Sequence, residues 1–254
     1  KLIPLLLIAF VGIFYIQPHF LSAFNLSGKS NFSAFSGAAT LTLWSFIGLE
    51  SASVPAGHVD NPTHNIPKAT ILGVVITTVV YILSSIAVMG VMPLTELAHS
   101  NAPYADAAHI MFGPIGSTIV AIGAVISCLG ALNGWILLQG QIPLAAAQDK
   151  LFPSIFLKKS SNGTPVVGLI ISSILISLLL LMTLNHSLVK QFTIIILLAT
   201  LASLIPYFLT TMSELVIFFK YPGLFKKTRK LFGSVVIAVL AGIYSFWVII
   251  GSGK

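Results

Sequence analysis

Glu50 is the one carboxylate that lies in the middle of a long apolar stretch, the segment 32–56. Serines and helix-weakening residues surround it, namely Ser45, Gly48, Ser51, Ser53 and Pro55. A charge at the centre of a bilayer costs about 2.5–3.5 kcal/mol on insertion scales, so such a side chain usually faces a cavity or a partner. Broken helices inside a bilayer are tolerated where they are buried in protein or line a water-filled cavity. The segment therefore predicts a broken helix at a binding site. A kinked helix with Glu50 hydrogen-bonded to a neighbour is the alternative.

A second segment with unusual residues lies within the apolar stretch 111–139. Small residues fall on one helical face there, and Gly130 and Gly134 form a Gly-x-x-x-Gly pair, which is typical of close helix packing. Trp135 lies on the adjacent face with Cys128, which we expect to be a small buried packing residue. Trp135 is either a ligand contact or an anchor. Aromatic faces such as those of Trp44 and Trp135 attract cations by about 0.5–2 kcal/mol.

No other residues have the spacing of an enzyme or a metal centre. The six histidines are scattered through ends and loops, and there is one cysteine. An intramembrane hydrolase would need a nucleophile with a base, a carboxylate pair or a metal motif, and the sequence has no His-Glu-x-x-His and no Gly-x-Ser-x-Gly. We therefore expect no catalytic residue, metal or cofactor. A membrane scaffold is a third interpretation, against which the polar, broken helix argues.

Composition identifies the element type that positions these residues. The chain has 254 residues, 56% hydrophobic and only 7% charged, whereas soluble domains carry about 25% charge. Soluble globular and disordered classes are excluded. Stretches of about 20 apolar residues predict an all-α, polytopic membrane helix bundle forming a single transmembrane domain. Its seven expected spans are 2–20, 32–56, 69–92, 111–139, 164–184, 191–219 and 231–251.

The basic residues predict the orientation of these spans. Of the 13 Lys and Arg residues, only Lys29, Lys190 and Lys254 fall on one side of the expected bundle, which leaves ten on the other. By the positive-inside rule the N-terminus is cytoplasmic and the C-terminus external. The basic run 226–230 is interpreted as a topology anchor with some attraction to anionic lipid, so no nucleic-acid partner is expected.

Several strings together resemble the basic amino acid/polyamine antiporters of the amino acid–polyamine–organocation (APC) superfamily, particularly those of arginine/agmatine type. They are residues 43–53, Asn61-Pro62 with 65–67, 128–130 with Gly134-Trp135, 151–156, and Pro206-Tyr207. The resemblance covers essentially the whole chain. It implies a LeuT-like fold of two inverted repeats, in which this chain matches spans five to eleven of twelve. Because the first residue is Lys1, we expect a fragment that lacks spans one to four and twelve and does not transport alone.

The resemblance also implies a site. It places the helix break at Ser45–Gly48, with backbone carbonyls near Trp44 and Ile47 taking the substrate α-amino group. Trp44 is implied as the aromatic gate, and Trp135 as the surface under the aliphatic part of the substrate. Glu50 matches the acidic residue associated with pH response.

Ala199 occupies a position where the arginine-type pattern has a hydroxyl residue, whereas ornithine/putrescine-type relatives are apolar there. The implied function is exchange of a cationic amino acid for its decarboxylated amine by alternating access in the bacterial inner membrane, supporting acid resistance. Arginine/agmatine is the expected pair. Ornithine/putrescine, lysine/cadaverine and a general amino acid permease remain alternatives. Expected partners are a homodimer mate and, functionally, a cytoplasmic amino acid decarboxylase.

Overall fold

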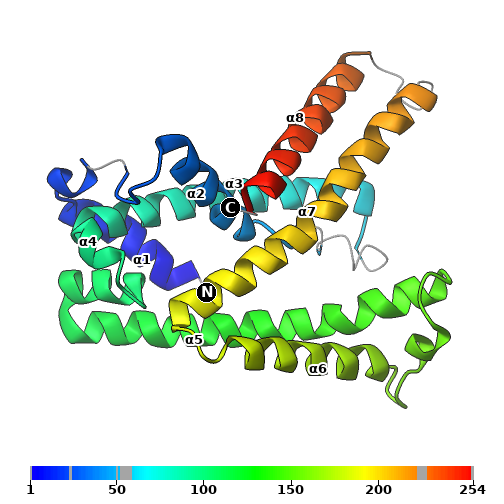
Figure 1. Cartoon of the computed structure of the whole chain (residues 1–254), viewed down its shortest axis with the longest axis horizontal. Coiled ribbons are helices and arrows are strands. Elements are labelled where there is room, and N and C mark those ends of the chain that lie inside the picture. The colour runs from blue at the N-terminus through cyan, green and yellow to red at the C-terminus, as the bar shows by residue number, and fades with distance from the viewer. Residues whose placement is uncertain (1, 23–24, 50, 52–58, 222–227, 253–254) are drawn as a thin grey trace. The chain divides into compact units, whose positions relative to one another are not determined.

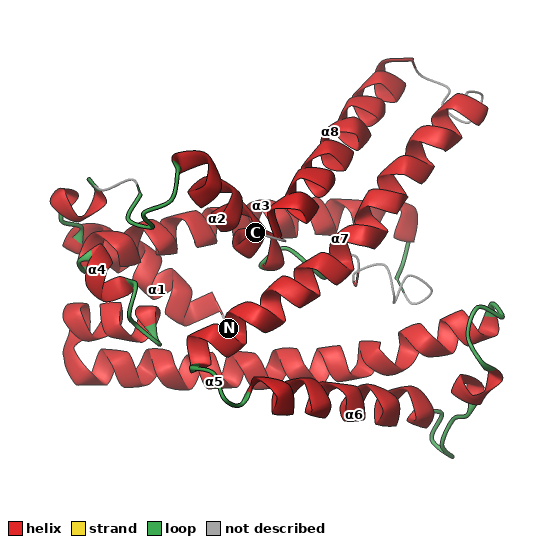
Figure 2. Cartoon of the chain, viewed as in Figure 1, coloured by secondary structure: helices red, strands yellow, loops and turns green. Residues whose placement is uncertain are grey.

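The computed structural model describes residues 2–22, 25–49, 51, 59–221 and 228–252. The chain forms two compact units, Lys1–Phe24 with Ser53–Ser187 (unit 1) and Asn25–Ala52 with Leu188–Lys254 (unit 2). Helices build both, and the described ranges contain no strand (Figures 1 and 2). The prediction of an all-α fold is confirmed.

Unit 1 holds four longer helices and several short turns. These are α1 (Leu2–Gly12), η1 (Ile13–Tyr15), η2 (Pro18–Leu21), α3 (Pro62–Val91), α4 (Leu94–Leu97), α5 (Pro103–Gln148), η5 (Ser154–Leu157) and α6 (Val166–Thr183). Unit 2 holds α2 (Asn31–Trp44), α7 (Leu188–Lys220) and α8 (Thr228–Ser252).

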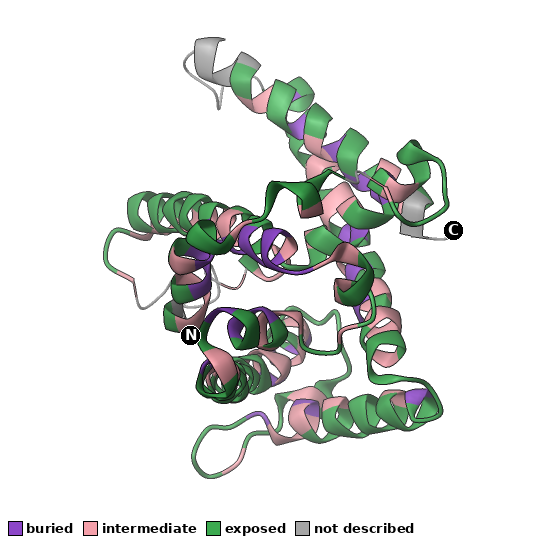
Figure 3. Cartoon of the chain, turned by 90° about the vertical axis from the view of Figure 1, so that its left-hand side faces the viewer, coloured by how far each residue is buried: buried purple, intermediate pink, exposed green. Residues whose placement is uncertain are grey.

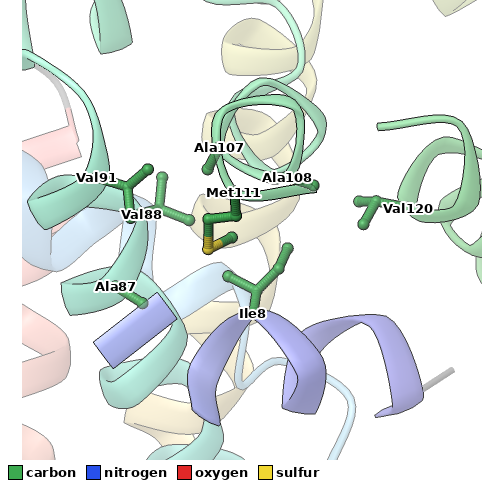
Figure 4. Packing of buried hydrophobic residues seen from close by; sticks show 8 residues of the cluster. All are labelled: Ile8, Ala87, Val88, Val91, Ala107, Ala108, Met111 and Val120. Atoms are coloured by element: carbon green, nitrogen blue, oxygen red, sulfur yellow. The ribbon is translucent and has the colours of Figure 1, made fainter. Parts of the chain in front are cut away.

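The core of unit 1 lies where α1, α3 and α5 meet, as Figure 4 shows. Its buried members are Ile8, Ala87, Val88, Val91, Ala107, Ala108, Met111 and Val120. α1 approaches α3 closely, because a Cβ on Gly12 would stand 2.7 Å from the Ala87 Cβ. After α1, the Gln17 N–H donates to the Gly90 carbonyl at 2.8 Å, which attaches the following turn to α3.

Packing along α5 differs from the expectation of close helix contacts around the Gly130/Gly134 pair and a buried Cys128. A Cβ on Gly123 would stand 2.6 Å from Pro4 of α1, and one on Gly140 would stand 2.7 Å from Pro165 at the start of α6. Gly134, by contrast, has open space within 4 Å, and Cys128 is exposed. The close approaches within the described chain therefore use Gly123 and Gly140. The interpretation of Cys128 as a buried packing residue is wrong, because α1 and α6 pack on other turns of α5.

Unit 2 buries small and hydroxyl-bearing side chains beside apolar ones such as Leu204 and Val248. α7 and α8 lie side by side (Figure 1), and α2 packs against both. Buried polar residues lie on all three helices, namely Ser36, Thr40, Thr200 and Ser245. A Cβ on Gly242 would stand 3.1 Å from Met212. Such small residues allow backbones to approach closely, as in helix pairs within membranes.

Five described helices are long and apolar enough to cross a membrane: α3, α5, α6, α7 and residues 233–250 of α8. Buried residues form narrow stripes along the helices, while most other residues are exposed or half-buried (Figure 3). Many exposed side chains are large and apolar, which suits surfaces that face lipid. The chain is accordingly a multi-pass membrane protein.

Helix boundaries depart from the expected spans in unit 1. α3 begins at Pro62, seven residues before the expected start at 69, and Pro67 lies inside it. α5 has a break at Gly113 (φ 69°, ψ −164°) and then runs through Pro143 to Gln148. The helix therefore continues to Gln148, nine residues beyond the expected end of this span at 139. The segment 2–20 is divided, because regular α-helix ends at Gly12.

Candidate functional site

The helix α2 ends abruptly at Trp44, and the chain continues in tight turns. The N–H groups of Ser45, Phe46 and Ile47 donate to carbonyls three residues earlier, at 3.0, 2.9 and 3.2 Å. Gly48 has φ 99°, in the region that favours glycine. The structure therefore has the helix break at residues 45–48, where the sequence predicted it.

Ser51 stabilises the turn after this break. Both its N–H and its hydroxyl donate to the Gly48 carbonyl, at 3.0 and 2.5 Å. A serine hydroxyl thus replaces one of the hydrogen bonds that a continuous helix would have made. Ser51 therefore has a structural role at the break, while Glu50 lies outside the described residues.

The end of α2 is electrostatically suited to a cation. The carbonyls of Thr42, Leu43 and Trp44 accept N–H groups from the turns, and that of Leu43 accepts from both Ser45 and Phe46. A carbonyl oxygen has two lone pairs. A helix C-terminus carries a partial negative charge that stabilises a nearby cation by about 0.3–1 kcal/mol. The last turn of α2 contains no basic side chain that would occupy this position.

Trp44 places an aromatic ring at the same point. Its side chain is 39% exposed, and its ring meets that of Phe192 on α7 edge-on, with centroids 5.8 Å apart and planes at 72°. Such aromatic pairs contribute about 0.5–1.5 kcal/mol beyond their buried area. Phe192 therefore helps to fix the orientation of Trp44. Sequence patterns did not indicate this role, because phenylalanine is common throughout apolar helices.

Ala199 lies on α7 two turns after Phe192, and it is half-buried. Residues seven apart fall on nearly the same face of a helix, about 10 Å apart along its axis. Ala199 thus shares the face of α7 that carries Phe192. Within unit 2 the structure brings Trp44, Ser45 and Ile47 together at the break, and it places Ala199 further along the facing helix.

Trp135 belongs to unit 1, in α5, and its side chain is 46% exposed. The residues around it, 131–137, are all exposed. The described chain therefore leaves the Trp135 indole uncovered rather than packing it into a core.

Metal-ligating clusters are absent from the described part of the chain: no three His, Cys, Asp or Glu residues there lie close enough to hold an ion. A cavity of about 580 Å³ in unit 1 is lined in part by Glu96, His99, Asp106 and His109, beside the start of α5. Asp106 accepts a hydrogen bond from Ser100. This cavity is separate from the break in α2.

Comparison with known proteins gives the family. A model of the family described as amino acid permease matches residues 1–252. The putrescine transporters PotE of Haemophilus influenzae and Escherichia coli K12 are 35% and 34% identical to the chain, over 92% and 100% of its length and 53% and 57% of theirs. A cadaverine/lysine antiporter of Escherichia coli K12 is 30% identical over 100% of the chain and 57% of its own length.

The chain thus spans about half the length of these relatives. All three are transporters by name, and the family match runs over nearly the whole sequence, including both units and the break in α2. The resemblance to the APC superfamily is confirmed, and the chain belongs to the amino acid permease family.

Proposed function

We propose that this protein is a secondary antiporter that exchanges a cationic amino acid for its decarboxylated amine by alternating access. The observation that carries the proposal is the break of α2, where a helix C-terminus, partly open carbonyls and the exposed Trp44 ring coincide. Each of these features favours a positively charged group. A substrate ammonium would donate hydrogen bonds to the carbonyl oxygens near Trp44 and Ile47.

The proposed substrates are a basic amino acid and a diamine. This choice is supported by relatives named as putrescine and cadaverine/lysine transporters, and by the apolar side chain of Ala199. A diamine ends in a compact ammonium, whereas arginine and agmatine end in a guanidinium with five fixed donors. A methyl group at position 199 offers such donors no acceptor. Ornithine/putrescine is thus the favoured pair, and arginine/agmatine is the second candidate.

Further parts of the proposal concern the surroundings of the site. Trp135 supplies the second aromatic face, against the aliphatic portion of the substrate. Glu50 adjusts the exchange to pH. The N-terminus of the chain is cytoplasmic and its C-terminus external in a bacterial inner membrane, and the protein works as a homodimer beside a cytoplasmic decarboxylase. Exchange of this kind exports one proton equivalent per cycle, because decarboxylation consumes a proton.

The substrate assignment can be tested by competition. The complete protein in detergent is incubated with labelled putrescine, and ornithine, lysine, cadaverine, arginine and agmatine are added as competitors. We expect ornithine and putrescine to compete at lower concentrations than arginine and agmatine. If arginine and agmatine compete best, the second candidate replaces the first. If no cationic competitor displaces the label, the antiporter proposal fails.

A variant of Ala199 sharpens the test. Ala199→Ser adds a hydroxyl acceptor and should improve arginine competition about fivefold, which corresponds to one neutral hydrogen bond. Ala202→Ser, an exposed position one turn away on α7, is the matched control and should leave the order unchanged. If the two serine variants change arginine competition equally, residue 199 does not contact the substrate.

A further inference from the structure

A small cavity lies between α2 and α8 in unit 2, away from the break. Its volume is about 150 Å³, and its lining includes Lys29, Phe32, Ser33, Ser36, Trp247 and Ile250. Lys29 and the serines come from the beginning of α2, and Trp247 and Ile250 come from the last turns of α8. The cavity therefore combines one ammonium group, hydroxyls and aromatic surface.

Ser36 is the residue that points to a ligand. It is only 9% exposed, it lines the cavity, and its hydroxyl makes no hydrogen bond within the described chain. Its backbone carbonyl accepts from the Thr40 hydroxyl at 2.9 Å. The Ser36 hydroxyl oxygen keeps some accessible surface at the cavity, so it is free to donate a hydrogen bond to an oxygen acceptor that binds there.

The backbone next to Lys29 is held in place by its loop. The Asn25 side-chain amide donates to the Lys29 carbonyl at 2.8 Å, and the Lys29 N–H donates to the Ser27 hydroxyl at 3.3 Å. Ser30 follows as the N-cap of α2 and accepts from the Ser33 N–H at 3.3 Å. Lys29 is thus presented at a helix N-terminus, where the partial positive charge adds to its own.

The charges around the cavity favour an anion. Neither α2 nor α8 contains a carboxylate, and the only acidic residues of unit 2 are Glu50 and Glu214. Glu214 does not line the cavity, and Glu50 lies outside the described residues. An anion bound beside Lys29 would therefore meet no like charge from the described lining.

The aromatic surroundings indicate where that anion comes from. The Trp247 ring stacks on Phe35 with centroids 5.9 Å apart, and it lies 6.3 Å from Phe32 and 6.0 Å from Tyr244. Phe32 and Phe35 are 70% and 60% exposed. Tryptophan and tyrosine gather where a membrane meets water, at the level of the headgroups. We infer that this cavity binds the phosphate of a phospholipid headgroup, with Lys29 and the Ser36 hydroxyl as its polar contacts and the acyl chains on the exposed phenylalanines.

The test uses Trp247 fluorescence in the complete protein, with Trp44→Phe, Trp135→Phe and replacement by phenylalanine of any tryptophan outside these 254 residues, so that Trp247 is the only indole observed. Dioctanoyl phosphatidylglycerol is titrated against dioctanoylglycerol, which has the same chains and no phosphate. We expect a saturable fluorescence change with the phospholipid only. Equal binding of dioctanoylglycerol would overturn the phosphate site. Equal binding of inorganic phosphate would overturn the lipid as its source.

Variants in the same background test the contacts. Lys29→Gln should raise the dissociation constant for the phospholipid about tenfold, Lys29→Arg should retain binding, and Ser36→Ala should weaken binding about fivefold. Lys190→Gln, on α7 and outside the cavity lining, is the matched control and should bind as the parent does. Parental affinity in both Lys29→Gln and Ser36→Ala would contradict the inference.

Discussion

The ring of Trp44 at the end of α2 meets the ring of Phe192 on α7 edge-on, at a centroid distance of 5.8 Å. This contact joins the broken helix to the helix that carries Ala199. It gives the exposed indole a fixed orientation at the C-terminal end of α2, where the last carbonyls carry a partial negative charge. A cation held there would contact both the helix end and the aromatic face.

The first prediction concerns this pair. Trp44→Leu should weaken binding of labelled putrescine about five- to thirtyfold, because it removes the aromatic face. Phe192→Leu should weaken it less, by about two- to fivefold, because it only releases the indole. The double variant should resemble Trp44→Leu. Additive losses in the double variant would mean that Phe192 acts independently. Phe208→Leu, in the other aromatic pair of α7, is the control and should bind normally.

The second prediction concerns the conformation of the break. Gly48 has φ 99°, and a side chain there should cost about 1–3 kcal/mol. Gly48→Ala should therefore lower the midpoint of thermal unfolding in detergent. Gly73→Ala is the matched control, since Gly73 lies within α3 and has open space around it; alanine is the better helix former, so this variant should be neutral or stabilising. If the two variants unfold at the same temperature, the positive φ at Gly48 does not carry the stability cost predicted here.

The third prediction concerns Glu50. Protonation at low pH would remove a negative charge next to the break, and it can change the exchange rate only if inward- and outward-facing states hold this carboxyl differently. Glu50→Gln should mimic the protonated state and flatten the acid activation of exchange measured in vesicles from about pH 4 to 8. Glu50→Asp should keep part of the pH dependence. An unchanged profile in the glutamine variant would leave Glu50 a structural hydrogen-bond partner.

The fourth prediction concerns orientation. The unequal distribution of Lys and Arg residues puts Lys158 in the cytoplasm and His186 outside. Single cysteines at these positions, in a Cys128→Ser background, can be treated with a membrane-impermeant thiol reagent in whole cells. The cysteine at 186 should react and the one at 158 should not. Reaction at 158 but not at 186 would contradict the predicted orientation.

Much of the fold follows from patterns that are local in the sequence. The bounds of the apolar stretches 164–184 and 191–219 lie within a few residues of the bounds of α6 and α7, because a change in hydropathy and a turn coincide at these positions. The break in α2 was predictable from Gly48, since few other residues adopt its backbone conformation.

The misplaced boundaries have a common physical cause. The expected spans began at 69 and ended at 139, yet α3 and α5 also include Pro67 and Pro143, because membrane helices tolerate proline where neighbouring groups satisfy the freed carbonyls. Contacts between distant elements were not visible either. Phe192 against Trp44, and Pro4 against Gly123, depend on which helices meet, and hydropathy does not specify that.

The most direct test of the proposed function is exchange by the complete protein in reconstituted vesicles. Vesicles are loaded with ornithine, with lysine or with buffer alone, and uptake of external labelled putrescine is followed in each. We expect uptake to require an internal basic amino acid, to be fastest with ornithine, and to fall with Trp44→Leu in proportion to the loss of binding. Uptake at the same rate into vesicles loaded with buffer alone would contradict antiport.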